Sequence, residues 1–180
     1  MSARRTRDAR GFTLLELLVV VAIVGIIAAI LIPSLVNSIQ KAKQKRTLAD
    51  VRNVGTAWMS WLTDQVGAAS AGANKRYDAS VFGEPSYPQL FGYLHPTDTF
   101  FYMQEVPEVD AWRYPLSFGL NSSLIAANVL IVCSGGADGA IEGGRCAKSW
   151  EVSPFVATKF DEDIVWADGY FVRWPAGVPR

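Results

Sequence analysis

An almost uncharged apolar segment near the N-terminus constrains the fold of this chain more than any other feature. Within residues 12–32 only Thr13 and Glu16 carry polar side chains. As a helix these 21 residues extend about 31 Å, the hydrocarbon thickness of a bilayer. A secretory signal has a shorter apolar core and a small-residue cleavage site, which Ile30-Leu31-Ile32-Pro33 does not provide. We therefore predict a retained transmembrane helix.

The charges of the chain balance overall but are unevenly distributed. Residues 1–11 hold four arginines against one aspartate, within a formal net charge of zero for all 180 residues. The balanced total gives no sign of nucleic-acid binding. A second basic cluster follows the apolar segment: Lys41, Lys43, Lys45 and Arg46. Since both flanks are basic, charge alone does not orient the helix. The second cluster could lie at lipid headgroups, contact acidic residues of another subunit or form a solvated face.

Glu16 is an unusual residue at the edge of a membrane helix. Insertion scales assign a carboxylate a cost of about 2.5–3.5 kcal/mol at the centre of a membrane helix. Near a helix end the side chain can instead reach back to the interface. Glu16 is therefore either such an interfacial residue or a carboxylate that awaits a cationic partner.

The sequence around Glu16 resembles a known family. Gly11-Phe12-Thr13-Leu14-Leu15-Glu16, between a short basic leader and the apolar run, is similar to the prepilin processing motif. This motif occurs in type IV pilins and in the pseudopilins of type II secretion. The resemblance implies that a prepilin peptidase cuts between Gly11 and Phe12 on the cytoplasmic side and that the new amino group of Phe12 is methylated. It further implies that the carboxylate of Glu16 pairs with the N-terminal amine of a neighbouring subunit, and Pro33 matches a proline common in the family.

The chain beyond the apolar segment predicts an α+β fold, with a long N-terminal helix packed on a small antiparallel sheet. We expect a cleaved leader (1–11), a transmembrane or filament-core helix (12–33), an amphipathic stem helix (34–66) and a globular head (67–180). Pro33 should kink or locally melt the helix. The stem carries an apolar stripe, which we expect to pack on the head with Leu48 to Leu62 as its core-facing part. The members of the stripe are Leu35, Ile39, Ala42, Leu48, Val51, Val54, Trp58, Trp61 and Leu62.

Within the head, residues 67–74 form a small-residue linker, and the prolines of residues 75–118 favour irregular loops. Strand-like runs occupy residues 129–133, 163–166 and 170–174, and Asp168-Gly169 between the last two signals a hairpin turn.

Three segments of the head resemble motifs of the major pseudopilin of type II secretion. Residues 110–115 are similar to its Asp-x-Trp-Gly-x-Pro, with Arg113 in place of glycine. Residues 134–139 are similar to its Ser-x-Gly-Ala-Asp-Gly, and residues 161–164 to its Asp-x-Asp-Ile. Residues 70–105 show no informative match, and the segment between Gly144 and Phe160 is longer than the loop of the family.

The resemblance also implies a calcium site in this loop region. Calcium takes six to eight oxygen ligands, usually carboxylates and backbone carbonyls of a flexible loop. The family carries its calcium here, which points to Asp138, Asp161 and Asp163, with Glu142 or Glu162 as further ligands. The alternative is that Asp138-Gly139 is simply a turn and that residues 161–163 form a solvated acidic run.

The two cysteines, Cys133 and Cys146, are too few for a disulfide scaffold and match no zinc pattern. In an oxidising compartment a disulfide between them would close a short loop and stabilise the fold by roughly 3 kcal/mol. Two independent buried thiols are the alternative.

No catalytic motif appears in the sequence. The single histidine, His95, lies in the proline-rich stretch, and no nucleophile elbow, phosphate-binding loop or zinc cluster is present. We expect no enzyme activity and no catalytic residues.

Taken with the resemblance, these features predict a structural subunit of a type II secretion pseudopilus. Its expected partners are the prepilin peptidase, identical and related pilin-like subunits, the inner-membrane assembly platform and the inner membrane itself. The subunit would cross the inner membrane once, with a cytoplasmic N-terminus and a periplasmic head, before it enters a periplasmic pseudopilus or an extracellular pilus. A type IV pilus subunit and a membrane-tethered binding or adhesion module that does not polymerise are the alternatives.

Overall fold

The computed structural model describes residues 12–66, 76–78, 82–97, 99–123 and 126–178. The predicted leader (1–11) and linker (67–74) lie outside these ranges. The chain divides into two compact units, Met1–Ile39 and Gln40–Arg180.

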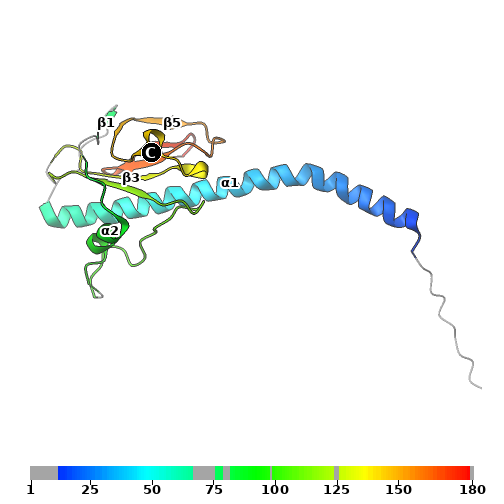
Figure 1. Ribbon diagram of the computed structural model, residues 1–180, viewed down its shortest axis with the longest axis horizontal. Helices are drawn as coiled ribbons and strands as arrows, with labels where there is room; N and C mark the ends of the chain where they lie inside the picture. Colours follow the sequence, from blue (N-terminus) through cyan, green and yellow to red (C-terminus); the bar gives the residue numbers. More distant parts are fainter. Residues whose placement is uncertain (1–11, 67–75, 79–81, 98, 124–125, 179–180) are drawn as a thin grey trace, which may run out of the picture. The chain divides into compact units, whose positions relative to one another are not determined.

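A single helix, α1 (Leu14–Val66), runs through both units (Figure 1). Its first turn is closed by a capping box, since the Thr13 hydroxyl accepts a hydrogen bond from the Glu16 N–H at 3.2 Å. In return, the Glu16 carboxylate accepts from the Thr13 N–H at 3.1 Å. These reciprocal bonds satisfy two backbone donors that a helix N-terminus otherwise leaves unpaired.

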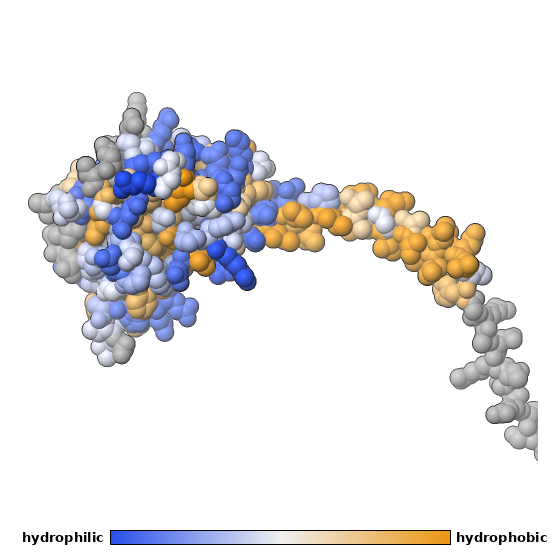
Figure 2. Space-filling view, in the orientation of Figure 1, coloured by the Kyte–Doolittle hydropathy of each residue, from blue (hydrophilic) through white to orange (hydrophobic). Residues whose placement is uncertain are grey.

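The N-terminal unit presents its apolar side chains to the outside. Large hydrophobic residues are exposed from Phe12 to Ile39, and apolar side chains cover this part of α1 in Figure 2. The helix is long and apolar enough to cross a membrane. It continues through Pro33, so the structure shows no break of the helix at this proline.

The second unit is built on a five-stranded sheet of order β2-β3-β6-β7-β5 (Figure 1). Its strands are β2 (Ser117–Leu120), β3 (Leu130–Ser134), β5 (Ser153–Phe155), β6 (Ile164–Ala167) and β7 (Tyr170–Pro175). Four of them pair antiparallel, as predicted, but β5 pairs parallel with β7 at the edge. The sheet is therefore mixed. A separate two-stranded sheet pairs β1 (Arg76–Asp78) with β4 (Ser149–Glu151).

The predicted hairpin turn at Asp168-Gly169 joins β6 and β7. Both residues have positive φ, 43° and 101°, as the two central residues of a type I′ hairpin turn require. The buried carboxylate of Asp168 accepts hydrogen bonds from the N–H groups of Val129 and Leu130 at 3.0 and 2.9 Å. This turn therefore also fixes the start of β3.

The five-stranded sheet is buried on both faces, because side chains alternate between two hydrophobic clusters. From β3, Leu130 and Val132 join the cluster of α1, and Ile131 and Cys133 join a second cluster. The second cluster includes Trp150 from the long segment after Gly144. Burial on both faces explains why the sequence of β3 is continuously apolar rather than alternating.

The predicted core stripe of α1 is confirmed from Leu48 onward. Its fully or nearly fully buried members are Leu48, Val51, Val54, Trp58 and Leu62. This agrees with the predicted core-facing part, Leu48 to Leu62, since Leu35 and Ile39 earlier in the stripe are 61% and 47% exposed. Two polar residues, Gln44 and Thr47, are buried in that part of the helix instead.

Gly55 lets α1 approach the sheet closely. A Cβ atom at this position would lie 2.2 Å from Cε3 of Trp166, which is itself buried. Trp166 belongs to the same core cluster as Val54 and Trp58. The indole therefore occupies the space that any other residue at position 55 would need.

We expect Gly55→Ala to lower the free energy of unfolding by about 1–3 kcal/mol, the usual cost of overpacking a core. Elsewhere in a helix the same change stabilises by about 1 kcal/mol. Gly92→Ala is the matched control, because Gly92 lies in α2 (Tyr87–Leu94) with open space around it. Thermal unfolding followed by circular dichroism measures both variants. Equal melting temperatures for the two would contradict the packing described here.

Helix α2 corrects the prediction that residues 75–118 are irregular. It begins after Ser86, whose N–H donates to the Gln89 side chain at 2.8 Å. Pro88 lies in the first turn, where a helix tolerates proline because the missing N–H has no intrahelical partner there. The number of prolines in this stretch therefore did not exclude a helix at residues 87–94.

Candidate functional site

The N-terminal residues with predicted roles in assembly lie at the exposed start of α1. Phe12 is 82% exposed, and Glu16 is held one turn away by its bonds to Thr13. Gly11, and with it the predicted cleavage bond, lies outside the described residues. Once a free amine exists at Phe12, the Glu16 carboxylate would lie near the positive end of the helix dipole and near that amine.

In the head, the carboxylate of Asp110 joins two of the motifs noted in the sequence. It is buried and accepts hydrogen bonds from the N–H groups of Trp112 and Tyr114 at 2.9 and 3.0 Å. Its other oxygen accepts a bond of 2.6 Å from the Ser134 hydroxyl. The tryptophan loop (110–115) and the serine-glycine turn (134–139) are thus one hydrogen-bonded unit.

The tryptophan loop is also fixed to the stem helix. The Trp112 Nε1–H donates to Gln40 Oε1 at 2.7 Å, and the Ala111 N–H donates to the Thr47 hydroxyl at 3.1 Å. These bonds explain why Thr47, which the sequence-based prediction missed, is buried. The available signal was the spacing of Gln40, Gln44 and Thr47, which places uncharged polar groups on one side of the helix.

Arg113 occupies the position where the family motif has glycine. Its φ is +73°, in the left-handed region that costs a residue with a Cβ roughly 1–2 kcal/mol. The glycine of the motif is therefore explained by backbone conformation. In this chain the loop keeps that conformation with arginine in place of glycine.

We expect Arg113→Gly to stabilise the head by up to about 1 kcal/mol, because relief of strain exceeds the flexibility that glycine adds to the unfolded chain. Arg113→Ala is the control, since it removes the side chain and keeps the strain. Differential scanning calorimetry should show a raised melting temperature for the glycine variant alone. Equal changes in melting temperature for the two variants would mean that loss of the arginine side chain, and not relief of the strained φ, causes the effect.

The predicted calcium ligands lie on two adjacent turns. The Ala137 N–H donates to the Phe160 carbonyl at 2.7 Å, which brings residues 136–138 beside residues 160–162. Asp138 and Asp161 are exposed, and Asp163 is buried. The Glu162 carboxylate forms ion pairs with Lys159 and Arg173. Within the described ranges, no three acidic, histidine or cysteine side chains are grouped so as to hold a metal ion. The side chains therefore fit calcium only in part, and the site stays a prediction.

Asp163 is the electrostatically unusual carboxylate of this region. Burial raises its pKa to about 6, although a hydrogen bond from the Glu142 N–H at 2.9 Å and the nearby Lys148 act in the opposite direction. The pKa of Asp163 is therefore higher in the folded chain than the value of 3.8 expected when the chain is unfolded. The protonated side chain thus stabilises the fold at low pH, and this contribution to the free energy of unfolding is lost as the pH rises through about 6. At neutral pH Asp163 is a buried anion that a nearby cation would stabilise.

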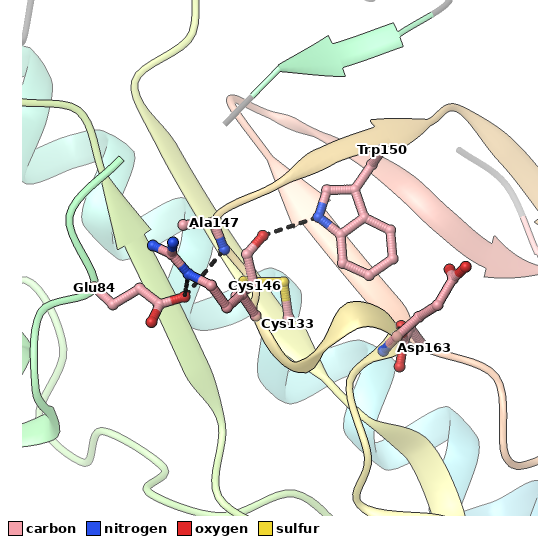
Figure 3. The surroundings of a disulfide bond; sticks show 8 residues. Glu84, Cys133, Cys146, Ala147, Trp150 and Asp163 are labelled. Carbon is pink, nitrogen blue, oxygen red and sulfur yellow. Dashed lines mark hydrogen bonds and ion pairs between the residues drawn. A yellow bond between two sulfur atoms is a disulfide. The ribbon is translucent and has the colours of Figure 1, made fainter. Parts of the chain in front are cut away.

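The structure joins Cys133 of β3 to Cys146 in a disulfide, with 5.8 Å between the Cα atoms (Figure 3). Both cysteines are buried. Trp150 lies beside them and donates from Nε1 to the Cys146 carbonyl at 2.9 Å. The bond anchors the long segment after Gly144 to the centre of the sheet. A disulfide between cysteines 13 positions apart raises the free energy of unfolding by about 3 kcal/mol.

Comparison with known proteins agrees with these features. The family pattern described as the prokaryotic N-terminal methylation motif matches residues 6–32. Type II secretion system core protein G of Klebsiella michiganensis is 31% identical over 114 residues, which cover 60% of this chain and 71% of that protein. The chain belongs to the core protein G family of type II secretion.

Other relatives of this core protein G family member match over shorter stretches. Core protein G of Escherichia coli is 40% identical over 48 residues, 27% of this chain and 33% of that protein. The type IV major pilin protein PilA of Myxococcus xanthus is 41% identical over 56 residues, 31% of this chain and 26% of that protein. These alignments thus cover a third or less of either relative. No solved structure matches the chain.

Proposed function

We propose that this chain is the major structural subunit of a type II secretion pseudopilus. The observation that carries the proposal is the 31% identity to a core protein G over 71% of that protein, together with the N-terminal methylation motif. The chain would act mechanically, as a repeated building block, and not as an enzyme. Prepilin peptidase would remove residues 1–11, and Phe12 would become the methylated N-terminus.

The exposed apolar surface of residues 12–39 supports polymerisation through the helix. Apolar surface in water costs about 25 cal/mol per Å², so these side chains require a bilayer or other protein around them. In the membrane the lipid would cover them. In the filament the corresponding helices of neighbouring subunits would replace the lipid, and Glu16 would pair with the amine of a neighbour.

The proposed location follows from the same helix. The subunit would cross the inner membrane once, with residue 12 at the cytoplasmic side and the head in the periplasm. Its partners there would be the prepilin peptidase, the assembly platform and other pilin-like subunits. The disulfide agrees with a head in an oxidising compartment.

Deletion of the gene in its own host tests this function. We expect type II export of proteins into the medium to stop and to return when the wild-type chain is supplied from a plasmid. Undiminished export without the chain would contradict the proposal. Loss of surface pili with normal export would identify a type IV pilus subunit, and a head that binds a ligand while the chain stays monomeric would identify a tethered binding module.

Calcium is a separate proposal, for the turns that carry Asp138, Asp161 and Asp163. The support is the buried carboxylate of Asp163 beside exposed backbone turns. Calcium should raise the melting temperature of the wild-type chain by several degrees and a chelator should reverse this, whereas Asp163→Asn should respond less. An unchanged melting temperature in calcium would rule out the site.

A further inference from the structure

A cleft at the edge of the five-stranded sheet has no role in the proposed function. It lies between β2, the start of α2 and the segment around Glu108, and its volume is about 240 Å³. It is lined by the buried side chains of Leu116 and Phe118 and by the exposed carboxylates of Glu84 and Glu108. We call it the β2 cleft. Apolar side chains together with two carboxylates fit a cation that is carried on an alkyl chain.

The edge of β2 adds a backbone acceptor to this cleft. Leu120 exchanges two hydrogen bonds of 2.9 Å with Gly83 on the outer side of the strand. Since alternate residues of an antiparallel strand direct their backbone groups to the same side, the carbonyl of Phe118 also points outward. The residue opposite Phe118 is Pro85, which has no N–H to donate. Within the described ranges, no other residue donates a hydrogen bond to this carbonyl.

The carboxylates of the β2 cleft retain free acceptors. Arg145 pairs with Oε1 of Glu84 at 3.5 Å and leaves Oε2 without a partner among the described residues. Glu108 forms no ion pair with any part of the chain that the structure describes. The β2 cleft can therefore accept a cation from outside the subunit.

Opposite charges are divided between the stem and the head. Residues 40–66 hold five basic and two acidic side chains, a balance of +3. Residues 67–180 hold eight basic and thirteen acidic side chains, a balance of −5. The acidic head of one copy is thus complementary in charge to the basic stem of another.

Lys45 is the stem cation best placed to reach another copy. It is exposed and forms no ion pair with the described residues. The buried face of α1 in this region consists of Gln44, Thr47, Leu48 and Val51. At about 100° per residue, Lys45 lies about 110° from the middle of that face, further than Lys41 or Lys43. Arg46 points further away still, but it is paired with Asp50.

We propose that the β2 cleft binds the Lys45 ammonium of a second copy of this chain. The inference rests on the proposed polymerisation, which brings copies together. An ammonium group carries three donors. The cleft offers acceptors for them on Glu84, Glu108 and the Phe118 carbonyl, and the lysine methylenes would lie on Leu116. The contact would join the head of one subunit to the stem of another.

The first test identifies the contact in the full-length chain. Isotope-labelled and unlabelled chains are reconstituted together in phosphatidylcholine vesicles and treated with a carbodiimide, which joins an amine to a carboxylate without a spacer. We expect a cross-link between Lys45 and Glu108 that combines labelled with unlabelled chains. A cross-link confined to one isotope would show a contact within one chain and overturn the proposal. Equal cross-linking of Glu105, an exposed glutamate outside the cleft, would do the same.

The second test exchanges the charges and measures the yield of assembled filaments. Glu108→Lys should lower the yield at least about fivefold, because it replaces attraction with repulsion. Lys45→Glu should do the same, and the two substitutions together should restore most of the wild-type yield. Glu105→Lys is the matched control, since it makes the same charge change outside the cleft. An equal loss in this control, or no recovery in the double variant, would contradict the contact.

Failure of the contact and failure of the proposed function give different results. A chain that assembles and supports export without the cross-link would refute the contact and keep the pseudopilus. A chain that shows the cross-link but supports no export would keep the contact and refute the pseudopilus. Cross-linking of Glu108 to a lysine of another protein in host membranes would overturn the second copy as the occupant of the cleft.

Discussion

Glu16→Ala is expected to abolish filament assembly while membrane insertion and leader cleavage continue. Removal of one partner of a buried ion pair costs about 3–5 kcal/mol, because the other charge is left buried and unpaired. In a filament that cost recurs at every subunit, so the sheared filament fraction should fall at least tenfold in an immunoblot. Membrane fractionation and the mass of the processed chain show whether the earlier steps are intact.

The capping box complicates this experiment and also supplies its control. Glu16→Ala removes both the carboxylate and its bonds to Thr13. Thr13→Ala breaks the box, at a cost of about 1 kcal/mol in helix stability, and keeps the carboxylate. Filament yield should therefore survive Thr13→Ala far better than Glu16→Ala. A normal yield from the Glu16 variant, or an equal loss in both, would contradict the pairing of Glu16 with an amine.

Gly11→Val is expected to leave the leader attached to the chain and thereby to prevent assembly. A larger side chain next to the cut bond should block the peptidase, and without the cut no free amine forms on Phe12. Intact-mass spectrometry of the membrane-extracted protein would show the 11 additional residues. Arg10→Lys is the control, because it changes the neighbouring residue and keeps its charge. A chain that begins at Phe12 in spite of Gly11→Val would disprove this cleavage site.

The parts of the fold that were predictable from sequence are those with local signals. The apolar run and its continuation predicted the end of the stem helix near residue 66, and Asp168-Gly169 predicted the hairpin. Both follow from periodicity or from the backbone preferences of two residues.

The parts that were missed depend on contacts between distant segments. Nothing near Gly55 in sequence indicates that Trp166 lies against it, and the parallel pairing of β5 with β7 depends on where the long segment after Gly144 returns to the sheet. Helix α2 was missed for a local reason, since one proline in its first turn was given the same weight as a proline in a helix interior.

For the candidate sites, the motif residues were predictable but their roles were not. The sequence singled out residues 110–115 and 134–139 by resemblance alone. The structure shows that the Asp110 carboxylate links them and that Gln40 and Thr47 hold the loop on the stem. The resemblance also drew attention to Asp163, but its raised pKa comes from burial that only the folded chain creates.

The most direct test of the polymerisation proposed here is a cryo-electron microscopy structure of the filament assembled from this chain. We expect residues 12–39 in the filament core, in contact with the same residues of neighbouring subunits. We also expect the Glu16 carboxylate at about 3 Å from the Phe12 amine of a neighbour, the distance of a charge-assisted hydrogen bond. Filaments held together by head contacts alone, with Glu16 in solvent, would contradict these expectations.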